Sequence, residues 1–135
     1  PPWGPGNLAY WRTVNKDSHR PSWPLFLERF CAEVARYSTG PVFVEMGLRW
    51  ETELVAAMER AGLPFVQRWE CLYGNPKRPN ALCLFRSAPL DLQGATGKGG
   101  PDLVRWALGA VGVGPGQIVL DPCTGLGTTA RVTVA

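Results

Sequence analysis

Segments with the patterns of helices and of strands alternate along this chain, and the alternation restricts its fold more than any other feature. Residues 24–37 and 51–62 have helical patterns, and residues 41–47, between them, form a short apolar run typical of a buried strand. Further along, residues 101–112 are helical and residues 117–121 are strand-like. Chains with this order build an α/β sheet that helices cover, and such sheets bind ligands at the carboxyl ends of their parallel strands.

The first two helical segments carry signals at their ends. Pro24 suits the first turn of one helix. The other has acids in its first turn and Arg60 in its last, and Gly62 supplies its stop. One apolar face of the 24–37 helix should pack on the sheet. That face consists of Leu25, Phe26, Phe30 and Val34 and extends to Tyr37.

Two further strand-like segments, 65–73 and 81–87, are joined by the polar turn GNPKRPN and predict a hairpin. We expect this hairpin to form an antiparallel edge of an otherwise parallel sheet. The 118–121 strand should run parallel to the 41–46 strand and lie next to the N-terminal segment. The hairpin turn is basic, which suits either a solvated loop or a contact with phosphate.

The amino-acid composition restricts which partners this protein can have. The chain of 135 residues has a net charge of +3, four cysteines that lie far apart and a single histidine, His19. The charge permits a polyanionic partner, and the cysteines lack metal-ligand spacing and indicate reduced, buried thiols in a cytoplasmic protein. No apolar run reaches the roughly 20 residues of a membrane span, so we expect no membrane partner. Because the cysteines lack metal-ligand spacing, we also expect no metal.

The stretch QIVLDPCTGLGTTA, residues 117–130, says most about function. An apolar run ends in Asp121, and Gly125 and Gly127 follow, where the missing Cβ lets the backbone approach a ligand. The N–H groups of a helix that begins near Thr128 would point at that ligand. A carboxylate directly before the glycines repels a phosphate but suits an amine-bearing ligand such as S-adenosylmethionine, which has an ammonium and a sulfonium group. A turn that only packs strand against helix is the alternative.

Two motifs together resemble the DNA amino-methyltransferases, which methylate the exocyclic amine of adenine (N6) or of cytosine (N4). One motif is D-P-x-x-G-x-G-T-T after an apolar strand, and the other is the PPW that opens the chain. The family's catalytic tetrapeptide is Asp, Asn or Ser followed by Pro-Pro and an aromatic residue. The resemblance implies a catalytic role for Pro1, Pro2 and Trp3, with the first member of the tetrapeptide directly upstream of Pro1.

The motif order, catalytic first and cofactor last, is similar to that of the family's permuted branch, often called the beta class. The resemblance implies a partial, three-layer, Rossmann-like S-adenosylmethionine-dependent methyltransferase fold that carries the family's fourth to seventh strands and its first. In the family's sheet these strands lie side by side. The second and third strands, with the acid that holds the cofactor ribose, would follow Ala135. The implied cofactor is S-adenosylmethionine and the implied substrate is DNA.

On this mapping a single partial methyltransferase domain spans residues 1–135, with an irregular catalytic-motif loop at 1–24 and a cofactor-binding part at 98–135. The implied cofactor-binding residues are Asp121, Pro122, Cys123, Gly125, Gly127 and Thr128, with Lys98 in a loop that flanks the cofactor. Cys123 stands where the family often has Phe, and its size suggests packing under the cofactor. Residues 1–135 do not include the first member of the tetrapeptide, so we do not expect them to catalyse methyl transfer by themselves.

The loop after the PPW motif mixes cations with aromatic residues, a pattern that suits stacking on bases and contact with a nucleic-acid backbone. These residues are Tyr10, Trp11, Arg12, Lys16, His19 and Arg20. A solvated loop anchored by its tryptophans is the alternative. Glu45, at the end of an apolar strand, faces either the site or the next turn. Two other functions stay open: an RNA adenine-N6 methyltransferase, and a catalytically inactive methyltransferase-like module that binds a nucleic acid or a partner protein.

Overall fold

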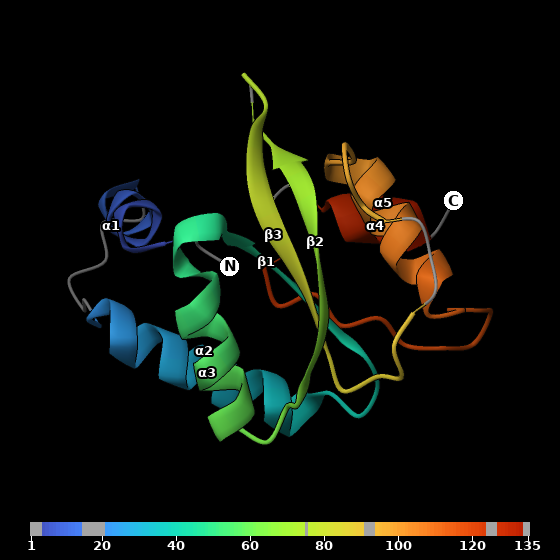
Figure 1. Cartoon of the computed structure of the whole chain (residues 1–135), viewed down its shortest axis with the longest axis horizontal. Coiled ribbons are helices and arrows are strands. Elements are labelled where there is room, and N and C mark those ends of the chain that lie inside the picture. The colour runs from blue at the N-terminus through green and yellow to red at the C-terminus, as the bar shows by residue number, and fades with distance from the viewer. Residues whose placement is uncertain (1–3, 15–20, 75, 91–93, 124–126, 134–135) are drawn as a thin grey trace.

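The computed structural model describes residues 4–14, 21–74, 76–90, 94–123 and 127–133. Its elements, in chain order, are α1 (Pro5–Val14), α2 (Trp23–Tyr37), β1 (Val42–Gly47), the 3-10 helix η1 (Leu48–Trp50), α3 (Glu51–Arg60), β2 (Phe65–Tyr73), β3 (Arg78–Phe85), α4 (Gly100–Ala110) and α5 (Thr128–Thr133) (Figure 1). Apart from the segment at 117–121, every predicted helix and strand is confirmed within a few residues of its expected ends. Gly62 ends α3 as predicted, with a φ of +85° that favours glycine.

The sheet has the strand order β1-β3-β2, and β3 is antiparallel to both of its neighbours. β1 and β2 therefore run parallel to each other, with one reversed strand between them. The β2–β3 pair confirms the predicted hairpin, and β2 forms an edge of the sheet. The expectation of an otherwise parallel sheet is wrong for the described strands, because β3 lies at the centre and pairs antiparallel with both neighbours. The β1–β3 ladder runs from Val42 opposite Phe85 to Gly47 opposite Asn80, whereas the β2–β3 ladder continues to Arg78.

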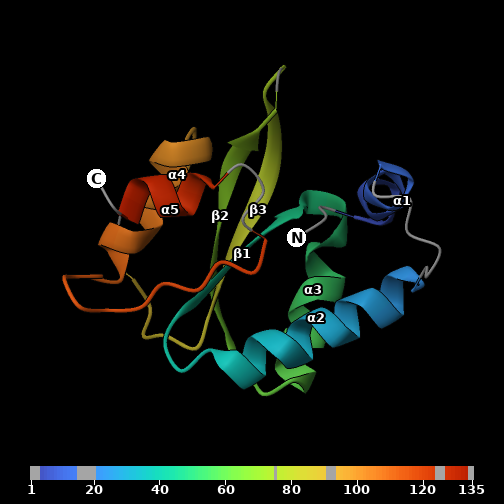
Figure 2. The same ribbon diagram turned by 180° about the vertical axis from the view of Figure 1, so that it is seen from behind.

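Helices lie on both faces of the sheet, so the fold has three layers and belongs to the mixed α/β class (Figures 1 and 2). On one face, Met46 of β1 and Phe85 of β3 pack with Leu54 of α3, and α2 completes this core. On the other face, Trp106 of α4 packs against Trp69 of β2. The two cores arise because successive residues of a strand point to opposite faces of a sheet.

The buried stripe of α2 differs from the predicted one. Buried residues are Trp23, Leu27 and Cys31, half-buried ones are Phe26, Phe30 and Val34, and Leu25 and Tyr37 are exposed. The prediction was wrong for Leu25, which lies about 200° around the helix from Trp23. It was also wrong for Tyr37, the last residue of the helix, whose ring contacts the Arg36 guanidinium.

The N-terminal segment contains a helix where irregular structure was expected. Pro5 begins α1, in agreement with the preference of proline for the first helical turn. Leu8 is buried in the core that α2 and α3 form with the sheet. Burial of Leu8 gives the helix a tertiary contact, and the short segment shows no strong apolar periodicity that could have predicted it.

The predicted strand at 117–121, parallel to 41–46, is wrong. Residues 117–120 have no strand pairing, and Ile118 is 96% exposed and Leu120 is 59% exposed. An apolar run forms a strand only when a neighbouring backbone satisfies its N–H and C=O groups. Among the described residues no strand pairs with this segment, so its backbone groups lack that partner.

Candidate functional site

The carboxyl ends of β1 and β2 lie at the same end of the sheet, because these strands are parallel. η1 follows β1 at this end, and Gly4 lies so close to Trp50 that a Cβ on Gly4 would collide with the indole. The residue that follows the PPW motif is thus fixed beside the carboxyl end of β1. Open α/β sheets bind their ligands at this end.

Trp50 has further neighbours that hold its ring in place. The Trp23 ring centroid lies 6.0 Å away, and the Arg49 guanidinium lies over the Trp50 ring at 5.3 Å. Trp23 Nε1 in turn donates a hydrogen bond of 3.0 Å to Glu53 on α3. The start of α1 therefore rests on an aromatic cluster that joins α2, η1 and α3.

A carboxylate and a carboxamide meet near the end of the β1–β3 ladder. Asn80 is only 7% exposed, and its Nδ2 donates a hydrogen bond of 2.9 Å to Oε1 of Glu45. Glu45 pairs with Leu82 across the ladder, and Leu82 belongs to the core under α4. Directly paired residues share a face, so Glu45 lies on the α4 side of the sheet, at the carboxyl end of β1.

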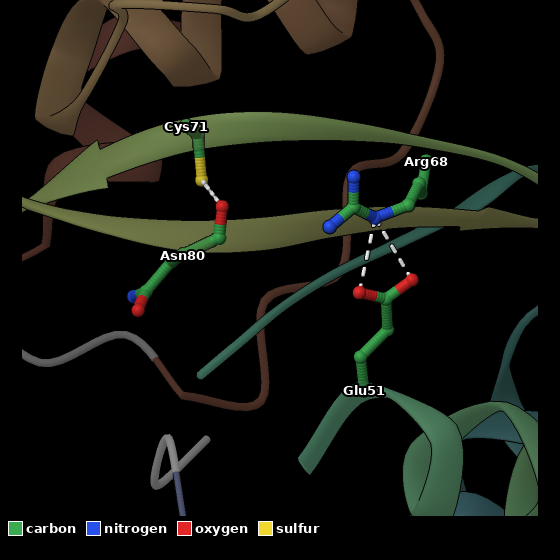
Figure 3. A network of polar contacts seen from close by, with 4 residues as sticks. All are labelled: Glu51, Arg68, Cys71 and Asn80. Atoms are coloured by element: carbon green, nitrogen blue, oxygen red, sulfur yellow. Dashed lines mark hydrogen bonds and ion pairs between the residues drawn. The ribbon is translucent and has the colours of Figure 1, made fainter. Parts of the chain in front are cut away.

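Three of the four thiols are buried, and their acidity reflects that burial. The Cys71 Sγ lies 3.6 Å from the Asn80 carbonyl oxygen (Figure 3). Burial, followed by the nearby charge of Glu45, raises the pKa of Cys71 to about 12. Burial also raises the pKa of Cys31 to about 11 and that of Cys83 to about 12. Cys123 is exposed, so the prediction of a buried thiol was wrong there, because it lies on a surface turn.

An ion pair ties the start of α3 to β2. The Arg68 Nε lies 2.9 Å from Oε1 of Glu51 and also donates a hydrogen bond of 3.0 Å to Oε2 (Figure 3). The Arg68 side chain is 41% exposed, so the pair contributes little to stability. Its effect is positional, because it fixes the first turn of α3 against the sheet.

The loop that carries Lys98 lies along the outer edge of β2. The Leu72 N–H donates a hydrogen bond of 2.8 Å to the Lys98 carbonyl. Gly99 approaches the Leu72 carbonyl so closely that a Cβ there would collide with the backbone, and Gly94 fits equally closely against Trp69. These two glycines let the loop lie against β2, and Lys98 is held beside the carboxyl end of that strand.

The segment with the cofactor motif turns at Asp121. Its Oδ1 accepts a hydrogen bond of 2.9 Å from the Cys123 N–H, which closes a turn over Pro122. Gly127 has a φ of +74°, a conformation that favours glycine, and Thr128 begins α5 directly after it. The helix start predicted near Thr128 is confirmed, whereas Asp121 closes a local turn and does not end a strand.

A small cavity of about 160 Å³ lies between α4 and α5. Its walls are Pro101, Arg105, Thr128, Arg131 and Val132. Small-molecule sites usually start at about 300 Å³, so this cavity is too small for a nucleoside ligand. It does show that the starts of α4 and α5 are neighbours, which puts Thr128 on the same side of the sheet as the Lys98 loop.

The structure describes only some of the predicted site residues. Asp121, Pro122, Cys123, Gly127, Thr128 and Lys98 are described, whereas Pro1, Pro2, Trp3, Gly125, Lys16, His19 and Arg20 lie outside the described residues, as do the side chains of Trp11 and Arg12. Tyr10, on α1, is 64% exposed. The structure adds Asn80, which sequence reasoning missed. The sequence offered one sign of it, because Asn80 directly precedes the apolar run ALCLF.

Within the described ranges, no helix is long and apolar enough to cross a membrane, and no group of three or more His, Cys, Asp or Glu side chains is placed to hold a metal ion. Comparisons of the chain with models of protein families, with curated proteins and with solved structures gave no match.

Proposed function

We propose that this chain belongs to an S-adenosylmethionine-dependent methyltransferase that acts on the exocyclic amine of adenine (N6) or cytosine (N4) in DNA. The observation that carries the proposal is the parallel pair β1 and β2 with β3 reversed between them. On the resemblance, these are the fifth, sixth and seventh strands of the family, with the last two as an edge hairpin. No described strand pairs with the side of β1 that faces away from β3. The family's fourth strand would pair on that side.

The positions of two motif-flanking residues support the same function. Gly4, directly after PPW, packs at the carboxyl end of β1, and Lys98 is bonded to the end of β2. The two residues are 94 positions apart in the sequence, yet both lie at the end of the sheet where α/β folds bind ligands. A catalytic loop and a cofactor-flanking loop would both be expected at this end of the sheet.

The chemistry of the 121–128 turn fits S-adenosylmethionine. Asp121 offers a carboxylate whose turn is fixed by the Cys123 N–H, and a Cβ on Gly127 would meet nothing within 4 Å, so backbone there is open to a ligand. When bound, S-adenosylmethionine supplies an electrophilic methyl group on its sulfonium. Asp121 would hold cationic or hydroxyl groups of the cofactor, and the first N–H groups of α5 would face its polar end.

The proposed catalytic residues act on the amine of the target base. An exocyclic amine is a poor nucleophile because its lone pair is delocalised into the ring. In the family's tetrapeptide the prolines restrict the backbone. On the resemblance, the Pro1 carbonyl would accept one amine hydrogen, and the family's Asp, Asn or Ser at the position before the two prolines would accept the other. The Trp3 ring stacks on a base that has flipped out of the duplex. Catalysis then consists mainly of positioning.

Calorimetry with S-adenosylmethionine tests this function through one carboxylate. The complete product of the gene should bind the cofactor, and Asp121→Ala should weaken binding at least tenfold. Asp102→Ala is the matched control, because Asp102 is an exposed acid whose ion pair among the described residues is with its helix neighbour Arg105, and its loss should leave binding unchanged. Absence of binding by the unmodified protein, or equal binding by Asp121→Ala, would contradict the proposal.

A further inference from the structure

The β2–β3 hairpin extends beyond the rest of the sheet. β1 ends opposite Asn80, whereas the hairpin adds two more rungs, up to Tyr73 opposite Arg78. Two strand residues span about 7 Å, and the turn adds to this length. The end of the hairpin therefore stands clear of the helical layers, at the top of Figure 1. We call the described residues 73–74 and 76–78 the hairpin tip.

The hairpin tip is basic and exposed. Lys77 and Arg78 are both exposed, and the sequence contains no acid from Cys71 to Leu90. Within the described part of the chain neither cation forms an ion pair. Two uncompensated cations on a protruding turn, with the partly exposed ring of Tyr73 beside them, suit contact with a polyanion.

Three acids near this end of the sheet belong to other contacts. Glu45 accepts its hydrogen bond from Asn80, and Glu51 pairs with Arg68. Glu53 accepts from the Trp23 indole. A fourth acid, the exposed Glu70 on β2, pairs with Ala81 three rungs below the Tyr73–Arg78 rung. All four carboxylates lie below the last two rungs of the hairpin, and none forms an ion pair with Lys77 or Arg78 among the described residues.

The hairpin tip lies at the same end of the sheet as the candidate site. The tip follows the carboxyl end of β2, and Arg78 is two residues from Asn80, whose side chain bonds to Glu45. Leu72, one residue before the tip, receives the Lys98 loop. A ligand that reaches the candidate site from above the sheet would therefore pass the tip.

We propose that the hairpin tip binds the phosphate backbone of duplex DNA and orients the duplex over the site. This inference rests on the proposed function and gives it a contact surface. Lys77 and Arg78 would each neutralise a phosphate, a contact that contributes affinity without sequence preference. The charge is fixed on a two-stranded ribbon, so it also defines the direction from which DNA approaches.

Salt-dependent binding to a fluorescent duplex of arbitrary sequence, measured by anisotropy without cofactor, tests the inference. Removing both cations in Lys77→Ala/Arg78→Ala should make the slope of log K against log[salt] shallower by about 2. The matched control is Arg36→Ala/Arg60→Ala, which removes the same charge from exposed residues at the ends of α2 and α3. Those helices end just before β1 and β2 begin, so the control charges lie at the opposite end of the sheet.

The inference predicts weaker binding and a shallower salt slope in the tip variant. In the control variant the slope should stay near that of the unmodified protein. Equal slopes in both variants would overturn it, because the effect would then follow net charge and not position. Tighter binding of a single-stranded RNA of equal length would overturn the assignment to duplex DNA. This assay needs no methyl transfer. Failure of the tip variant to lose binding while Asp121→Ala loses the cofactor would therefore remove only this inference.

Discussion

Asn80 on the central strand donates a hydrogen bond of 2.9 Å to the Glu45 carboxylate on β1, next to the last rung that these strands share. Asn80 is the one polar or charged residue that is buried among the described residues. The bond sets the direction of a carboxylate at the carboxyl end of β1. It also joins that strand to the base of the hairpin that carries the basic tip.

Replacing Asn80 should reduce stability because it leaves the partly buried Glu45 carboxylate without this donor. For Asn80→Ala the free energy of unfolding should fall by about 1–3 kcal/mol. Urea denaturation measures the change. The control is Thr52→Ala, at an exposed position of α3, which should change stability by less than about 0.5 kcal/mol. A similar, small effect of both variants would show that the bond contributes nothing.

Asn80→Asp keeps the size of the side chain and separates lost packing from lost hydrogen bonding. Two carboxylates would then face each other, which raises the pKa of one of them in the folded state. The protonated form is favoured in the folded state, so stability should be recovered as pH falls below that raised pKa and lost as pH rises to neutral. A loss of stability that is the same at pH 4 and pH 7 would contradict this explanation.

The burial of three of the four thiols determines which of them a reagent can reach. Cys123 is exposed, whereas burial raises the pKa values of Cys31, Cys71 and Cys83 from the ordinary 9.0 to about 11, 12 and 12. At pH 8 a disulfide reagent should label one thiol in the folded protein and four after denaturation. Rapid labelling of all four thiols without denaturant would contradict the burial of the three.

The same thiols should make the fold less stable in alkali. Their pKa values are higher in the folded state than in the unfolded state, so the unfolded state loses its thiol protons first. The stabilising contribution is complete below pH 9 and is lost as pH rises from 9 to about 12. Denaturant titrations across this interval should give a falling free energy of unfolding, and a constant value would contradict the assignment.

Two glycine-to-alanine substitutions should change the stability of the protein in opposite directions. Gly99→Ala inserts a Cβ against the Leu72 carbonyl and should destabilise the protein by about 1–3 kcal/mol, because backbone has to move. Gly109 lies inside α4 with nothing within 4 Å of an added Cβ, so Gly109→Ala should stabilise it by about 0.5–1 kcal/mol. Thermal denaturation compares them, and equal midpoints would show that the Lys98 loop does not lie against β2.

Local patterns predicted much of the fold. The hairpin at 65–85 and the helix stop at Gly62 follow from turn residues and apolar periodicity, which are properties of neighbours in sequence. The segment at 117–121 could not be assigned in this way, because an apolar run needs a paired backbone to become a strand. The buried stripe of α2 depended on Trp23, one residue before the predicted start of that helix.

The candidate site was predictable only in part. The helix start at Thr128, directly after a glycine, follows from the motif itself. The Asn80–Glu45 bond joins residues 35 positions apart, and only the register of the sheet brings them together. The place of Lys98 beside β2 likewise depends on tertiary contact, which no local pattern contains.

Methyl transfer to DNA tests the central claim most directly. The complete product of the gene, incubated with tritiated S-adenosylmethionine and duplex DNA, should label the DNA, and nucleoside analysis should find N6-methyladenine or N4-methylcytosine. Trp3→Ala should lower the rate by roughly tenfold or more, since stacking on a flipped base contributes about 1–3 kcal/mol, whereas Trp3→Phe should retain most of it. Label found in RNA alone, no label in DNA, or a Trp3→Ala variant as active as the unmodified protein would contradict the account.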